Sequence, residues 1–188
     1  RRSSSPLDET GHPSLLIASR DGHVGLAALL LDRGADVSPM LPQASRQVAL
    51  LANILKRLLD DGPPNKLTKF HALKPPKISI EAYLERIETY ADCSPSCFVV
   101  SLIYIDRLCQ GSLMSLSALN IHRVLITAIC VASKFLDDSY YSNGFYSQLG
   151  GISLEELNNL EVEFLYGLNF MLYVSTNEYQ RYCSGMNP

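Results

Sequence analysis

Two charged side chains lie at positions where the surrounding residues are apolar. Lys134 falls in the last turn of an apolar run, between Ser133 and Phe135. Glu161 falls on an apolar helical stripe, one turn after Leu157. Removing a charge from water is costly unless the group is paired or hydrogen-bonded, so each side chain needs a partner. The two could pair with each other, Lys134 could neutralise the C-terminus of its helix, or both could bind another molecule.

Other residues capable of chemistry form no catalytic or metal-binding pattern in the sequence. There is no Gly-rich phosphate loop, no His-Glu-x-x-His helix and no nucleophile elbow. The 4 histidines share no spacing, and among the 5 cysteines only Cys93 and Cys97 are close together. No further ligands complete a zinc site, so we interpret the cysteines as small buried hydrophobic residues. We therefore expect no enzymatic activity, no cofactor and no metal ion.

Composition points to a globular protein inside the cell. Of the 188 residues, 47% are hydrophobic and 19% are charged, which predicts a sizeable buried core. The net charge of -3 argues against binding nucleic acid or an acidic membrane. No apolar run is long enough to cross a bilayer, and the N-terminus lacks the apolar core of a signal peptide. We expect a nuclear or cytoplasmic protein that is not secreted.

Helical periodicity predicts that the chain is all-α, apart from a possible extended stretch at 170–174. The run at 123–138 is apolar almost all the way round, so its helix should lie at the centre of the fold. Asn120 can cap this helix, and similar start signals occur at Ser79, at Ser153 and at Ser175. The helices are expected at residues 43–59, 80–91, 95–111, 120–138, 143–149, 153–169 and 175–183.

Residues 11–38 resemble one ankyrin repeat. The resemblance rests on Pro13 to Ala18, on Asp21-Gly22-His23, and on Leu29-Leu30-Leu31 followed by Gly34-Ala35-Asp36-Val37. It implies a hairpin of two helices, but one repeat cannot cover both of its apolar faces and no second copy follows. We expect either the last unit of a longer array or a segment joined by an irregular gene model, with Met40 as a plausible start. The expected divisions are a leader at 1–39, a helix and connector at 40–78, and the main domain at 79–188.

The main domain resembles a cyclin box, a fold of five helices with the third at its centre. The resemblance rests on three blocks: Tyr104-Ile105-Asp106-Arg107, then Ala132-Ser133-Lys134-Phe135, and Leu160-Glu161 ahead of Leu168-Asn169-Phe170. Further blocks are similar to those of the plant U-type (P-type) cyclins, which resemble the yeast cyclins of phosphate signalling. These blocks are Phe70-His71-Ala72-Leu73, Pro75-Pro76, Ser79-Ile80, Cys93 to Phe98, and Gly150-Gly151-Ile152.

This resemblance implies a non-catalytic regulatory subunit that activates a cyclin-dependent protein serine/threonine kinase as a heterodimer. In the family, the lysine and glutamate that match Lys134 and Glu161 bond the main chain of the kinase. The matching apolar residues, which grip the mobile helix of the kinase, are Val131, Phe135 and Leu165. We expect no nucleic acid, membrane or small-molecule substrate as a partner. The alternative is a cyclin-fold or ankyrin-type scaffold that activates no kinase, with its function in the cyclin fold or in an ankyrin array.

Two further expectations concern acidic residues and the first helix of the box. The family uses the aspartate that matches Asp106 inside the fold, and we expect it to form a structural ion pair with Arg86. Asp137 should either face basic groups of the kinase or be solvated. Cell-cycle cyclins carry a Met-Arg-Ala-Ile-Leu run and a Trp that dock substrate peptides, whereas this chain has Ile-Glu-Ala-Tyr-Leu and no Trp. We therefore do not expect that groove to recruit substrates.

Overall fold

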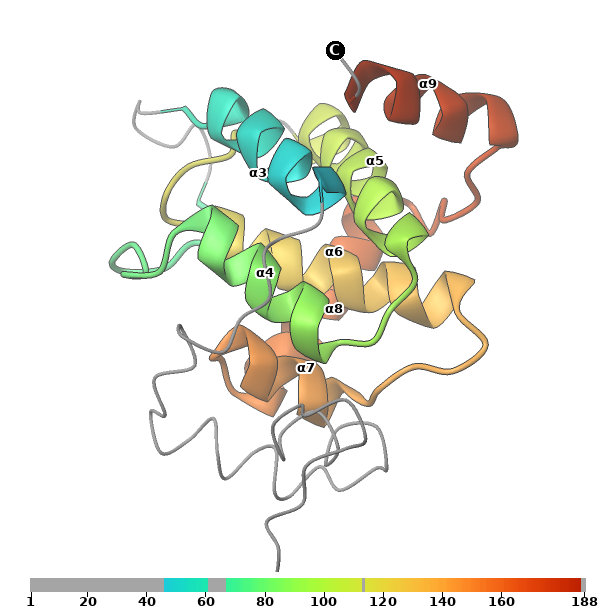
Figure 1. The fold of residues 1–188 in the computed structure, drawn as a ribbon. Coiled ribbons are helices and arrows are strands. Elements are labelled where there is room, and N and C mark those ends of the chain that lie inside the picture. The colour runs from blue at the N-terminus through green and yellow to red at the C-terminus, as the bar shows by residue number, and fades with distance from the viewer. Residues whose placement is uncertain (1–45, 61–66, 113, 187–188) are drawn as a thin grey trace, which may run out of the picture.

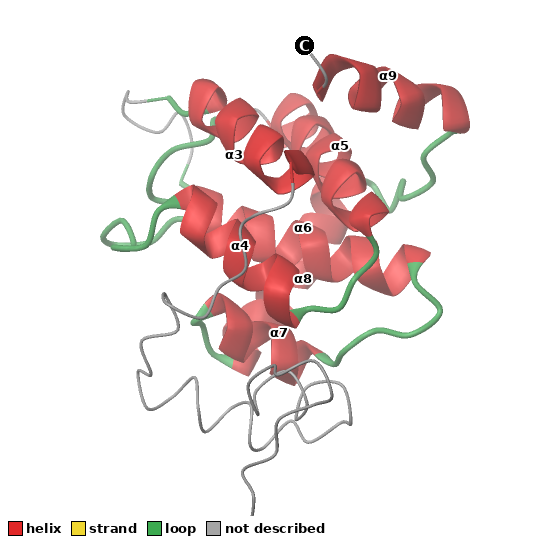
Figure 2. Cartoon of the chain, in the orientation of Figure 1, coloured by secondary structure: helices red, strands yellow, loops and turns green. Residues whose placement is uncertain are grey.

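The computed structural model describes residues 46–60, 67–112 and 114–186, and these residues form seven helices and no strand (Figure 2). The predicted hairpin at 11–38, the leader at 1–39 and the boundary at Met40 lie outside these ranges. The all-α prediction is confirmed, with α4 to α8 as the five-helix box and α3 and α9 flanking it. The helices are α3 (Arg46–Leu58), α4 (Ile80–Tyr90), α5 (Pro95–Ser112), α6 (Ile121–Leu136), α7 (Asn143–Gly150), α8 (Leu154–Gly167) and α9 (Thr176–Met186).

Helix α6 runs through the middle of the bundle, and the other box helices pack around it (Figure 1). Every side chain from Ile121 to Ser133 is buried except that of Arg123. Burying apolar side chains releases ordered or poorly bonded water and stabilises the folded state, so a helix that is apolar on all sides is most stable at the centre. The prediction of a central helix is therefore confirmed.

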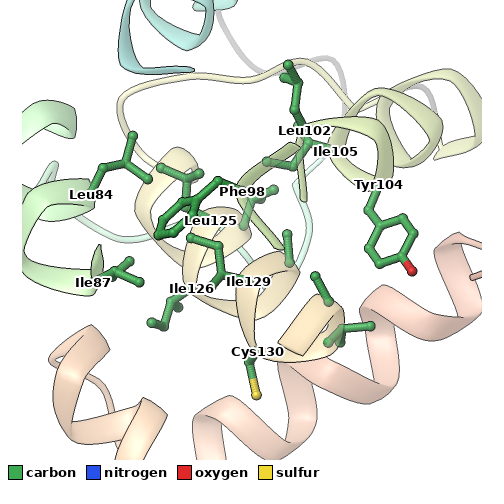
Figure 3. Packing of buried hydrophobic residues seen from close by; sticks show 14 of the residues in the cluster. Leu84, Ile87, Phe98, Leu102, Tyr104, Ile105, Leu125, Ile126, Ile129 and Cys130 are labelled. Atoms are coloured by element: carbon green, nitrogen blue, oxygen red, sulfur yellow. The ribbon is translucent and has the colours of Figure 1, made fainter. Parts of the chain in front are cut away.

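Helix α6 makes most of its contacts with α5, and α7 and α8 also pack against it. Side chains of α4 point into the same core (Figure 3). Phe98 and Leu102 of α5 and Leu84 of α4 are buried in one cluster with Leu125 and Ile129 of α6. Helix α3 covers α4 and α5, and α9 packs against α5 and α3. No helix formed by the described ranges is both long enough and apolar enough to span a membrane.

Three of the predicted N-terminal caps are confirmed. Ser79 Oγ accepts a hydrogen bond from the N–H of Ala82, and Ser153 Oγ accepts one from Glu156. Ser175 Oγ does the same for a residue three positions later, at the start of α9. Each bond satisfies a main-chain donor that has no partner inside its own helix, which fixes where the helix begins.

Asn120 is the N-cap residue of α6, as predicted, but its carboxamide makes no capping hydrogen bond and orders the turn before α6 instead. Asn120 Oδ1 accepts a hydrogen bond from Ser117 N at 2.9 Å, and Nδ2 donates to Ser115 O at 2.9 Å. The N–H of Ile121 is already satisfied by Ser117 O at 3.1 Å. The side chain of Asn120 therefore orders the segment that precedes α6, through its hydrogen bonds to the main chain of Ser115 and Ser117.

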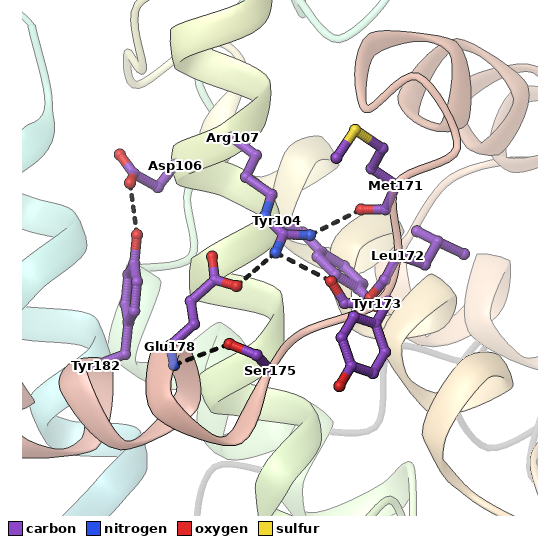
Figure 4. A network of polar contacts seen from close by, with 9 residues as sticks. All are labelled: Tyr104, Asp106, Arg107, Met171, Leu172, Tyr173, Ser175, Glu178 and Tyr182. Atoms are coloured by element: carbon purple, nitrogen blue, oxygen red, sulfur yellow. Dashed lines mark hydrogen bonds and ion pairs between the residues drawn. The ribbon is translucent and has the colours of Figure 1, made fainter.

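The segment between α8 and α9 is held against α5 through its main chain (Figure 4). Tyr104 Oη donates to Leu172 O at 2.7 Å. Arg107 Nη1 donates to Met171 O at 2.7 Å, and Nη2 donates to Tyr173 O at 3.1 Å and to Glu178 Oε2 at 2.7 Å. These bonds occupy carbonyl groups that have no partner in a helix, so the linker is ordered without secondary structure.

We expect Gly150→Ala to destabilise the protein because α7 lies too close to α6 for a side chain. A Cβ at Gly150 would lie 2.9 Å from Ile126 Cγ1 and 3.3 Å from Tyr83 Oη. Isoleucine in a helix has one strongly preferred χ1 rotamer, so Ile126 cannot turn aside freely. The free energy of unfolding, measured by urea denaturation, should fall by about 1–3 kcal/mol.

Gly144 in the same helix is the matched control for this substitution. The nearest atom to a Cβ there is Ser142 Oγ at 3.5 Å, which is ordinary van der Waals contact. Gly144→Ala should leave stability unchanged or raise it by up to about 1 kcal/mol, because alanine favours helix. Equal effects of the two substitutions would show that α7 does not approach α6 as described.

Candidate functional site

Lys134 and Glu161 form an ion pair that joins α6 to α8. Lys134 Nζ donates to Glu161 Oε1 at 2.6 Å, and the side chains are 28% and 18% exposed. The last turn of α6 supplies the lysine, and the apolar stripe of α8 supplies the glutamate. The two charges that lacked a partner in the sequence are therefore paired with each other in the structure. Both remain partly accessible from outside.

Asn143, the first residue of α7, holds the other oxygen of the carboxylate. Its Nδ2 donates to Glu161 Oε2 at 2.7 Å and to Asn158 Oδ1 at 2.8 Å. The Cys130 thiol lies 3.6 Å from Asn143 Oδ1, and burial raises the pKa of Cys130 to about 12, so the thiol is neutral and can donate. The site thus draws on three helices. Sequence reasoning missed Asn143, because an asparagine at a helix start is usually read as a local cap.

Exposed apolar side chains lie beside the ion pair. Phe135 and Leu136 follow Lys134 and are 48% and 40% exposed, and Val162 follows Glu161 and is 53% exposed. Leu165 is partly buried against the core, whereas Val131 is only 3% exposed. Of the three predicted gripping residues, Phe135 is therefore the most accessible. Apolar groups around a small polar centre are typical of a surface that binds protein.

Asp137 closes the C-terminal end of α6 on the start of α5. Its Oδ2 accepts hydrogen bonds from Ser94 N at 3.1 Å, from Cys97 Sγ at 3.2 Å and from Ser133 Oγ at 3.4 Å. Burial alone would raise the pKa of Asp137, but these hydrogen bonds lower it on balance. The expectation that Asp137 is simply solvated is corrected, because donors within the protein hold its carboxylate. It sits at the N-terminus of α5, where the helix dipole favours a negative charge.

The predicted ion pair between Asp106 and Arg86 is wrong, because the two residues have different partners. Asp106 Oδ2 accepts from Tyr182 Oη at 2.5 Å and from Gln110 Nε2 at 2.8 Å (Figure 4). Arg86 Nη2 donates to Gln148 O at 3.2 Å. Asp106 thus lies on the side of α5 that α9 covers, while Arg86 on α4 faces α7. Burial, followed by the bond to Asp106, raises the pKa of Tyr182 to about 12.

The geometry of the site is suited to binding another protein. Its polar groups form hydrogen bonds between helices, and no group of His, Cys, Asp or Glu within the described ranges could hold a metal ion. The ion pair offers a cationic donor and an anionic acceptor at a fixed separation, next to apolar surface. Such an arrangement can recognise the N–H and C=O groups of another main chain.

We expect Asp137→Asn to lower the free energy of unfolding near neutral pH, because asparagine cannot accept charge-assisted hydrogen bonds. The pKa of Asp137 in the folded protein lies below its ordinary value of 3.8. Its stabilising effect is therefore complete above that value and is lost as the pH falls through the folded-state pKa. Urea denaturation of both proteins at several pH values measures the difference. A difference that persists in strong acid would contradict the role of the charged carboxylate.

Known proteins match the region that contains these helices. The family model for Cyclin matches residues 43–172. The chain is 45% identical over 150 residues to Cyclin-U4-1 of Arabidopsis thaliana, covering 74% of each protein. It is 38% identical over 160 residues to Cyclin-U4-2 of the same plant, covering 80% of this chain and 74% of that protein. It is 46% identical over 116 residues to Cyclin-P3-1 of Oryza sativa subsp. japonica, covering 62% of this chain and 49% of that protein. With its all-helical box and central α6, the chain belongs to the cyclin family, among the plant U-type and P-type cyclins.

Proposed function

We propose that this cyclin is the activating subunit of a cyclin-dependent protein serine/threonine kinase and binds it through the ends of α6 and α8. Cyclins are regulatory subunits rather than enzymes, so family membership supports a regulatory role. The observation that carries the proposed interface is the partly exposed pair of Lys134 and Glu161 with apolar side chains beside it. The partner acts inside the cell, in the nucleus, the cytoplasm or both.

The ion pair keeps hydrogen-bonding capacity for a partner. Lys134 has further N–H donors beyond the one that Glu161 accepts, and each carboxylate oxygen of Glu161 has a second lone pair. A kinase carbonyl can therefore accept from Lys134 while a kinase N–H donates to Glu161. Because Asn143 already orients the carboxylate, little side-chain entropy is lost when the partner binds.

The apolar side chains beside the pair supply the rest of the interface. Phe135 loses water-exposed area when a kinase helix packs on it, together with Leu165 at the edge of the core. Val131 lies one helical turn before Phe135 and is buried, so it supports the contact surface from below. A cyclin that binds the active arrangement of the kinase better than the inactive one shifts the population toward the active state.

Lys134→Ala and Glu161→Ala should each weaken binding to a co-expressed cyclin-dependent kinase. Removing one member of a desolvated, hydrogen-bonded charge pair typically costs about 2–5 kcal/mol of binding free energy. The melting temperature of the free cyclin should stay within a few degrees of the wild type. Isothermal titration and phosphate transfer to a generic substrate measure binding and activation. Binding without a gain in kinase activity would favour a scaffold.

Glu156→Ala is the matched control, because Glu156 also joins α8 to α6, through Arg123 Nε at 2.6 Å. It should leave kinase binding unchanged. The double substitution Lys134→Glu with Glu161→Lys separates the two roles of the site. It restores an ion pair within the cyclin but exchanges donor and acceptor toward the kinase, so the melting temperature should again stay close to that of the wild type while binding stays weak. Recovered binding would mean that the pair serves only the fold.

A further inference from the structure

A second polar region lies at the opposite end of α6, in a cavity of about 300 Å³ between α4, α6 and the turn from α7 to α8. Arg86 of α4 lines it together with His122 and Arg123, both from the first turn of α6. None of the described residues that line it is acidic. At a rise of 1.5 Å per residue, Arg123 lies about 17 Å along the helix from Lys134. This region is therefore separate from the proposed kinase surface.

Arg86 is a partly buried cation that lacks a counter-charge. Its Nε is buried and has no hydrogen-bond partner in the described part of the chain. Its guanidinium donates to Gln148 O, but no ion pair with an acidic side chain occurs within the described ranges. Burial of the guanidinium lowers the pKa of Arg86, which reflects the cost of keeping this charge away from water. An anion in the cavity would compensate this charge.

His122 lines the same cavity and carries a buried hydrogen-bond acceptor. The ring is 9% exposed, and its Nε2 lies 3.0 Å from Ile78 O. A carbonyl oxygen can only accept, so Nε2 carries the hydrogen and Nδ1 of the neutral ring is an acceptor. Nδ1 is buried and has no partner among the described residues. Burial also lowers the pKa of His122, which favours the neutral ring.

We propose that this cavity binds a singly protonated phosphate group. Its oxygen atoms accept hydrogen bonds from Arg86 and Arg123, and its P–OH donates to His122 Nδ1. The Nε of Arg123 is occupied by Glu156, which leaves the terminal N–H groups of the guanidinium for the ligand. The first turn of α6 adds the positive end of the helix dipole, which favours an anion.

The combination of donors and an acceptor distinguishes phosphate from other anions. A carboxylate or a sulfate carries no proton near neutral pH and cannot donate to His122 Nδ1. A phosphate monoester has a second pKa of about 6 and retains a proton in part of the population. The cavity is at the lower end of the volumes of ligand pockets, so it has room for a phosphate and the first atoms of the group that carries it.

Isothermal titration of the full chain at about pH 6 and constant ionic strength tests this proposal, with inorganic phosphate, sulfate, O-phosphoserine and serine as probes. Phosphate should bind saturably and at least about tenfold more tightly than sulfate, which matches the loss of one hydrogen bond to a charged group. Serine should not bind. Tighter binding of O-phosphoserine than of inorganic phosphate identifies a phosphorylated protein as the source, and the reverse order identifies the free ion.

Arg86→Gln should weaken phosphate binding at least about tenfold, because it removes the cation and its donors. Arg181→Gln, at an exposed arginine of α9, is the control and should bind like the wild type. If circular dichroism shows that Arg86→Gln does not fold, the comparison of phosphate with sulfate on the wild type decides the question alone. Absent phosphate binding, equal affinity for phosphate and sulfate, or a folded Arg86→Gln protein with unchanged affinity would each overturn the proposal.

Discussion

The burial of α6 on nearly all sides is the constraint on which the rest of the structure depends. A helix in that position can carry charge only near its ends, and each charge there needs a partner from another helix. Arg123 at one end meets Glu156, Lys134 at the other end meets Glu161, and Asp137 just beyond meets α5. The charged side chains of this helix and their ion pairs therefore lie at its two ends.

Much of this architecture could be predicted from local patterns in the sequence. The all-α class, the central position of α6 and the caps at Ser79 and Ser153 depend on periodicity and on residues a few positions apart. Lys134 and Glu161 could be singled out for the same reason, because each interrupts an apolar stripe of its own helix. Local signals of this kind are reliable when any other conformation of the same segment would lose several favourable interactions at once.

The partners of polar side chains could not be predicted in the same way. Asp106 bonds Tyr182 rather than Arg86, and Asn143 bonds Glu161 rather than its own helix, because α9 and α8 bring these residues together across long stretches of sequence. The cavity beside Arg86 has the same origin, since its lining comes from three separate segments with no common spacing. Such choices depend on how whole helices pack, which propensity and spacing do not encode.

Side chains of α5 hold the linker between α8 and α9 through its main-chain carbonyl groups, which leaves the side chains of the linker free to vary. Tyr104 and Arg107 bond only carbonyl oxygens along it, while the side chains of Met171 and Tyr173 are 67% and 76% exposed. Every amino acid presents the same carbonyl group, so these two positions can diverge among paralogues without loss of the hydrogen bonds from Tyr104 and Arg107. A surface anchored in this way can acquire new preferences for partners while the fold beneath it is conserved.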